Sequence, residues 1–125
     1  ADNGVKMVRE GRCMQRIGAW TTVWPPYSLA MIAAMLEKHG VEIKMNDCIV
    51  EEITFSGLGE RIKEFQPDIV FINTATPSIF SDLKVVSLAK SINPKITTIA
   101  IGIHPSELPE ECFDIQPKMD YIING

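Results

Sequence analysis

Apolar residues recur at the spacing of one helical face within the stretch from Val23 to Gly40. They are Leu29, Ile32, Ala33 and Leu36. The steps i, i+3, i+4 and i+7 place all four on one side of an α-helix. Pro26 suits the first turn of that helix, and Gly40 suits its C-terminal cap. The pattern therefore predicts a helix that ends near His39 and that a tryptophan and two prolines precede.

Four later stretches have the patterns of β-strands. Val41 to Asp47 alternates apolar and polar residues, which predicts a strand near a sheet edge with one wetter face. Asp68 to Asn73 and Ile96 to Gly102 are almost continuously apolar, which is typical of strands covered on both faces. Asp120 to Gly125 is predicted to be the last strand.

Helices are predicted between these strands. Leu58, Ile62 and Phe65 indicate a second helix, with Ser56 as its cap and Pro67 just after its end. A third helix is expected from about Ser81 to Ile92, because Leu83, Val86 and Ala89 follow one another at three-residue steps. The segment "IHPSELPEE" is expected to be a loop with at most a short helix. The methionines Met31 and Met35 are assigned to the core.

Strands that alternate with helices predict an α/β fold: a doubly wound, flavodoxin-like or Rossmann-like parallel sheet with helices on both faces. The first predicted helix has no strand before it, so we expect a central first strand upstream of Ala1. We also expect residues 1–125 to be a single domain that is truncated at both ends. Internal repeats and linkers are not evident in the sequence.

Composition excludes several classes of function. The 125 residues are 46% hydrophobic and carry a net charge of −4, and their 12 Lys and Arg are scattered. A nucleic-acid-binding domain needs a basic face, so we exclude that class. No apolar run approaches the length of a membrane span and no signal peptide is evident, so a cytoplasmic protein without membrane insertion is expected. The three cysteines are far apart, which favours reduced thiols.

Ligands of such folds bind at the carboxyl ends of the strands. The segments expected there are Gly18 to Ser28, Asn73 to Ser78 and Gly102 to Glu111. They are rich in hydroxyl residues, proline and glycine and almost free of charge, which suits a large and mostly neutral ligand. Neither a dinucleotide-binding GxGxxG nor a phosphate-binding P-loop is present.

No catalytic dyad is evident among these residues. Ser78 and Ser106 have no identifiable base, and His39 suits the C-terminal end of the first helix through the helix dipole. His104 follows a glycine at a strand end, where hydrogen bonding to a ligand or a loop carbonyl is favoured over metal ligation. We predict no catalytic residue and no metal ligand.

The combined motifs resemble a known family, the N-terminal cobalamin-binding domain of cobalamin-dependent radical SAM enzymes. The matching segments, in the family's order, are "WPPYSLAMIAAMLEKHGVEIKMND", "PDIVFINTATPS", "IGIHPSELPEE" and "DYIING". They cover nearly the whole chain. The resemblance implies that cobalamin is the ligand.

The resemblance also implies which residues contact cobalamin. The segment from Thr21 to Pro26 would form a rigid wall beside the corrin ring. Gly102, which has no side chain, would leave space for the nucleotide tail of cobalamin. A methyl group at this position is expected to be tolerated, whereas a branched side chain would block the tail. The implied cofactor-binding residues are Thr21, Thr22, Trp24, Pro25, Pro26, Thr74, Thr76, Ser78, Gly102, His104 and Ser106.

Two departures from related sequences refine this expectation. The Asp-x-His-x-x-Gly motif that places a histidine on cobalt in many cobalamin modules is absent, so the resemblance implies cobalamin with its lower base displaced and no protein histidine on cobalt. The Cys-x-x-x-Cys-x-x-Cys motif is also absent. A radical SAM domain with a [4Fe-4S] cluster and S-adenosylmethionine is therefore expected after residue 125. The alternative is a non-enzymatic flavodoxin-like domain for ligand binding or signalling.

Overall fold

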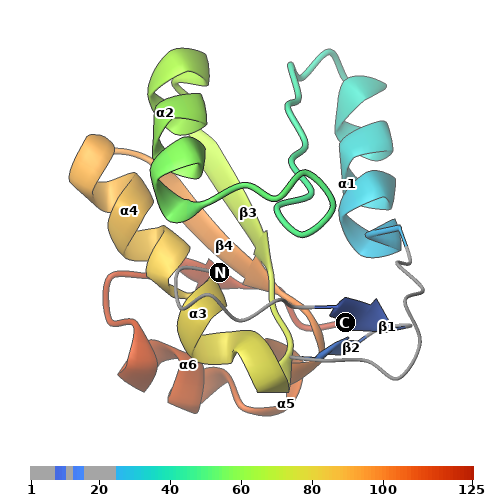
Figure 1. Ribbon diagram of the computed structural model, residues 1–125, viewed down its shortest axis with the longest axis vertical. Helices are drawn as coiled ribbons and strands as arrows, with labels where there is room; N and C mark the ends of the chain where they lie inside the picture. Colours follow the sequence, from blue (N-terminus) through green and yellow to red (C-terminus); the bar gives the residue numbers. More distant parts are fainter. Residues whose placement is uncertain (1–7, 11–12, 16–24) are drawn as a thin grey trace.

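A three-stranded parallel sheet forms the centre of the molecule (Figure 1). The computed structural model describes residues 8–10, 13–15 and 25–125. The sheet has the order β3-β4-β5 and consists of Ile69–Asn73, Thr97–Ile101 and Tyr121–Ile122. In its longest ladder, Ile69 of β3 lies opposite Thr97 of β4, and Asn73 lies opposite Ile101. The predicted α/β fold with a parallel sheet is confirmed.

Helices connect these strands, and a short antiparallel pair precedes them. The helical elements are α1 (Tyr27–Glu37), α2 (Phe55–Phe65), the 3-10 turn η1 (Thr76–Ser78), α3 (Ile79–Asp82), α4 (Lys84–Ile92), α5 (Ile103–Glu107) and α6 (Pro109–Ile115). Near the N-terminus, β1 (Val8–Glu10) pairs with β2 (Cys13–Gln15), a hairpin that the sequence pattern did not predict. No helix in the described ranges is long and apolar enough to cross a bilayer.

The core lies between the sheet and the helices α2, α4 and α6. Leu83, Val86 and Ala89, which defined the predicted third helix, are fully buried. Leu83 and Val86 pack with Cys112 of α6, and Ala89 packs with Ile62 of α2. The hydrophobic pattern therefore identified the buried face of this helix correctly.

Two helix boundaries differ from the prediction. α2 is capped by Thr54, whose hydroxyl accepts a hydrogen bond from the Gly57 backbone N–H at 3.2 Å. Ser56, the predicted cap, lies inside the helix, because a cap works only one step outside the first helical residue. The predicted third helix begins earlier, at Ile79, and is interrupted at Leu83 into α3 and α4.

The segment after β4 is more helical than predicted. It folds into α5 and α6, which Leu108 separates. Pro109 occupies the first position of α6, where a proline needs no hydrogen-bond partner for its nitrogen. Two helices therefore stand where a loop with at most a short helix was expected.

Residues 41–47 are irregular, so the predicted strand there is wrong. A strand is stable only when its backbone groups pair with a neighbouring strand. In the described part of the chain no strand pairs with the β3 edge that faces these residues. A groove of about 610 Å³ lies between them, and both β3 and residues 41–46 line it. The missing neighbour explains why an alternating sequence does not form a strand.

Helix α1 forms the other wall of this groove, on the side of β3 opposite to α2 and α4 (Figure 1). Its predicted apolar face is confirmed, because Leu29, Ile32, Ala33 and Leu36 all line the groove. The assignment of Met31 and Met35 to the core is wrong, since they are 66% and 63% exposed. They lie outside the four-residue face and therefore point away from it.

Candidate functional site

The loops that follow β3 and β4 meet at the carboxyl edge of the sheet (Figure 1). We call residues 74–78 the β3 loop and residues 102–108 the β4 loop. The Thr74 N–H donates to the Ile101 carbonyl at 2.9 Å, so the two loops leave the sheet side by side. This is the edge at which parallel α/β sheets bind ligands.

Gly102 lies against the backbone of the β3 loop. Its φ of 127° lies in the region that favours glycine. A Cβ at this position would lie 2.2 Å from the Thr74 carbonyl oxygen and 3.3 Å from Asn73 Oδ1. The expectation that a methyl would be tolerated is therefore wrong, because the backbone of the β3 loop already occupies that space.

The predicted hydroxyl residues brace these loops. Thr74 Oγ1 donates to the Ile101 carbonyl at 3.4 Å, and Ser106 Oγ donates to the Gly102 carbonyl at 2.8 Å. Thr74 and Ser78 are buried, whereas Thr76 is exposed. The structure thus brings together all the candidate residues of the two loops.

His104 joins the loops through its imidazole. Its Nδ1 lies 3.1 Å from Thr76 Oγ1, so its partner in the structure is a side-chain hydroxyl of the β3 loop and not the loop carbonyl that the sequence suggested as an alternative to a ligand. The side chain is 4% exposed, and its Nε2 has no hydrogen-bond partner although Glu111 Oε2 lies 3.9 Å away. This buried nitrogen is an unsatisfied polar group at the candidate site.

Ser78 contacts a residue that sequence analysis overlooked. Its Oγ donates to Asp82 Oδ2 at 2.6 Å, and the Ala75 carbonyl lies 3.3 Å from the same hydroxyl. Burial raises the pKa of Asp82 to about 6, against the opposing effect of hydrogen bonds from Ser78 and the Ala75 backbone. Ser78 and Asp82 are four residues apart, a spacing that brings two side chains together on one face of a helix. The sequence did not reveal this contact, because the predicted helix began at about Ser81 and so did not include Ser78.

Part of the predicted site lies before α1. Thr21, Thr22 and Trp24 are outside the described residues. Pro25 is exposed and Pro26 is partly buried, directly before the first turn of α1. That turn lies at the same end of the molecule as the carboxyl end of β3 (Figure 1).

Exposed apolar residues follow the strand ends and were not among the sequence candidates. Phe80 in the first turn of α3 is 67% exposed, and Ile103 at the start of α5 is 51% exposed. Because the described β3 and β4 loops carry no charge before Glu107, this edge offers apolar and neutral polar contacts. Such a surface fits a large neutral ligand better than a phosphate or a metal ion. The signal in the sequence was an apolar residue at the start of each following helix.

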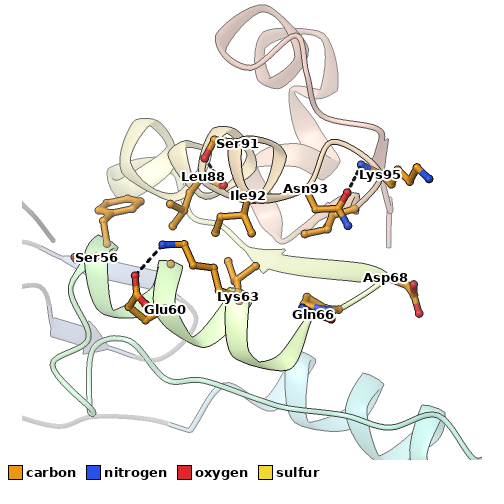
Figure 2. A pocket seen from close by; sticks show the side chains of 15 residues that line it. Ser56, Glu60, Lys63, Gln66, Asp68, Leu88, Ser91, Ile92, Asn93 and Lys95 are labelled. Atoms are coloured by element: carbon orange, nitrogen blue, oxygen red, sulfur yellow. Dashed lines mark hydrogen bonds and ion pairs between the residues drawn. The ribbon is translucent and has the colours of Figure 1, made fainter.

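A second groove among the described residues lies away from the carboxyl edge. It is a groove of about 1020 Å³ between α2 and α4, near the amino ends of β3 and β4. Figure 2 shows Leu88 and Ile92 beside α2, with an ion pair between Lys63 and Glu60 at the rim. α/β sheets bind at the opposite edge, so we assign no ligand to this groove.

Comparisons with known proteins identify relatives of this chain. Residues 17–125 match the model of the B12 binding domain family. An uncharacterized methyltransferase of Pyrococcus horikoshii is 34% identical over 105 residues, which are 83% of this chain and 22% of that protein. An anaerobic magnesium-protoporphyrin IX monomethyl ester cyclase of Rubrivivax gelatinosus is 29% identical over 82% of this chain and 19% of that protein.

A solved structure supports the fold. The N-terminal domain of a hypothetical protein of Thermotoga maritima has a TM-score of 0.54 and 22% identity, and the match covers 87% of this chain and 82% of that one. The chain spans only about a fifth of the length of the two enzymes above. The family match includes both loops of the carboxyl edge, and from it we conclude that the chain belongs to the B12-binding domain family.

Proposed function

We propose that this domain holds cobalamin at the carboxyl edge of its sheet for methyl or electron transfer in an adjoining catalytic domain. The observation that carries the proposal is the pair of uncharged, mutually braced loops that the family match includes. Cobalamin supplies a cobalt centre that can accept and release a methyl group or electrons. The domain itself contributes binding and orientation.

The residues present suit such a ligand. Phe80 and Ile103 offer apolar surface beside the β3 and β4 loops, and Thr76 offers an exposed hydroxyl. Thr74 and Ser106 hold the backbone of the loops by donating to loop carbonyls, and Ser78 ties the β3 loop to Asp82. Loops fixed in this way lose little conformational entropy when a ligand binds.

We propose further that no protein histidine binds cobalt and that the lower base of cobalamin is displaced. The sequence has two histidines. His39 Nδ1 lies 2.8 Å from the Met35 carbonyl, at the end of α1 remote from the site, and His104 is buried against Thr76. Neither imidazole projects from the carboxyl edge.

An absorbance titration of the intact protein with methylcobalamin tests this function. We expect saturable binding and the spectrum of cobalamin whose lower base is displaced. A bound spectrum identical to that of free cobalamin would contradict base displacement. Absence of binding would favour the alternative, a flavodoxin-like domain that binds another ligand or transmits a signal.

Replacing His104 separates a bracing role from cobalt ligation. We expect His104→Ala to weaken cobalamin binding by about 0.5 to 1.5 kcal/mol, the value of one net hydrogen bond, and to leave the bound spectrum unchanged. His39→Ala is the control, since it removes an imidazole at the far end of α1. A changed cobalt spectrum in His104→Ala alone would identify His104 as an axial ligand.

The catalytic partner is proposed to be a radical SAM domain after residue 125, with a [4Fe-4S] cluster and S-adenosylmethionine. The small share of the relatives' length that this chain spans supports further domains in the protein. The names of the relatives, a methyltransferase and a cyclase, support methyl transfer or oxidoreduction as the overall reaction. The reading frame around the encoding sequence tests this, because it should contain a Cys-x-x-x-Cys-x-x-Cys motif downstream and a strand upstream that fills the groove beside β3.

A further inference from the structure

Asp82 lies directly behind the β3 loop and is bonded to it. Ser78 Oγ donates to Asp82 Oδ2 at 2.6 Å, and hydrogen bonding from the Ala75 backbone also favours the carboxylate. Both Ser78 and Ala75 are buried. One carboxylate therefore bonds to the last residue of η1 and to the residue that precedes η1, so it holds both ends of this turn of the β3 loop.

The charge on Asp82 determines where the Ser78 hydroxyl points. A serine hydroxyl has one hydrogen to donate. While Asp82 is ionised, that hydrogen is committed to the carboxylate. When Asp82 binds a proton from solvent, its own O–H can donate to Ser78 Oγ. The serine hydrogen is then available to another acceptor, either the Ala75 carbonyl at 3.3 Å or an acceptor oxygen on a ligand.

We propose that Asp82 is a positioning residue of the cobalamin site, and that its protonation frees Ser78 to donate a hydrogen bond to the nucleotide tail of cobalamin. The inference rests on the proposed function. Binding then favours the protonated carboxyl, so cobalamin is bound more tightly below about pH 6 than above it. The raised pKa of Asp82, about 6, places this change within an accessible range.

Other titratable groups near the loop have to be separated from Asp82. His104 contacts the β3 loop through Thr76, and Glu111 lies 3.9 Å from its Nε2. Among the described residues, the pKa of Asp82 is raised by burial and lowered by its hydrogen bonds with Ser78 and Ala75, and no charged side chain contributes. A variant that changes Asp82 and leaves His104 in place therefore isolates the carboxyl.

The test compares methylcobalamin affinity at pH 5.5 and pH 8 by absorbance titration of the intact protein. We expect the parent to bind about fivefold more tightly at pH 5.5, the effect of about one hydrogen bond. Asp82→Asn should lose this dependence, because an amide does not titrate. Ser78→Ala should lose it too, since the hydroxyl is the group that Asp82 controls. Asp68→Asn, the same change at the exposed amino end of β3, should keep it.

Several results would overturn the inference while leaving the proposed function intact. They are binding by the parent that does not change with pH, and a parental pH dependence that survives in Asp82→Asn or in Ser78→Ala. Cobinamide, which lacks the nucleotide tail, should bind without the pH dependence, and an unchanged dependence would refute the assignment to the tail. Absence of binding at both pH values would refute the proposed function itself.

The melting temperature of the protein gives a reading that needs no cobalamin. An acid whose pKa is higher in the folded state than in the unfolded state reduces stability as pH rises from its ordinary pKa of 3.8 to its raised pKa of about 6. Asp82→Asn should therefore raise the melting temperature at pH 8 and not at pH 4. An equal effect at both pH values would contradict a carboxyl that titrates near pH 6.

Discussion

Replacing Gly102 with alanine should destabilise the domain by more than about 3 kcal/mol, a large part of the 5 to 15 kcal/mol that stabilises a typical domain. The added Cβ would lie 2.2 Å from the Thr74 carbonyl oxygen. Relief of that overlap would push the β3 loop away from β4 and break the 2.9 Å bond between the Thr74 N–H and the Ile101 carbonyl. The backbone conformation, with φ of 127° and ψ of 179°, adds about 1 to 3 kcal/mol of strain for any side chain.

Gly40→Ala is the matched control for this prediction. Gly40 also has a positive φ, of 78°, but an added Cβ there would meet no atom within 4 Å. Its replacement should cost only about 1 to 2 kcal/mol, the conformational term alone. Urea unfolding of both variants measures the difference. Equal stabilities would show that the β3 and β4 loops do not approach each other as closely as the structure indicates.

This result also changes what a substitution at Gly102 can say about cobalamin. From the sequence alone, we expect Gly102→Val to block the path of the nucleotide tail while the domain stays folded. The structure shows that even a methyl collides with the β3 loop. Loss of binding in Gly102→Val would therefore follow from loss of folding, and the substitutions of Ser78 and Asp82 are the better probes of the site.

Asp120→Ala should destabilise the domain by about 2 to 3 kcal/mol at neutral pH. Asp120 Oδ2 accepts hydrogen bonds from the Thr98 N–H at 2.7 Å, from Thr98 Oγ1 at 2.9 Å and from Lys90 Nζ at 2.6 Å. Thr98 is fully buried, so removing the carboxylate leaves a buried hydroxyl without this partner, which costs about 1 to 3 kcal/mol. The loss of the ion pair adds less, because the Asp120 side chain is 33% exposed and solvent screens its charge.

The pH dependence of this effect has a definite sign. The hydrogen bond from Lys90, followed by that from the Thr98 backbone, lowers the pKa of Asp120 from its ordinary value of 3.8. The stabilisation is therefore complete above about pH 4 and is lost as the pH falls through the lowered pKa. Thermal melts of the parent and Asp120→Ala should converge in acid.

Asp68→Ala provides the comparison for Asp120. Asp68 also precedes a strand of the sheet, and it is exposed. Its replacement should change stability by no more than about 0.5 kcal/mol. A similar small effect for Asp120→Ala would mean that Asp120 acts only as an ordinary turn residue.

The sequence by itself determined those helices and strands whose hydrophobic pattern can be recognised within a single segment. Leu83, Val86 and Ala89 repeat along a single helix, and the apolar runs in β3 and β4 are continuous, so each could be recognised without knowledge of its neighbours. The carboxyl-edge loops could be located for the same reason, because their position follows from the order of strands and helices.

The tertiary structure decided everything that depends on a partner distant in the chain. Residues 41–47 alternate like a strand but form none, since the β3 edge that faces them lies across a groove. Gly102 is constrained by Thr74, and the role of Asp120 depends on Thr98 and Lys90. A hydrogen bond or a steric contact needs two groups at a defined distance, and only folding brings groups from different segments to that distance.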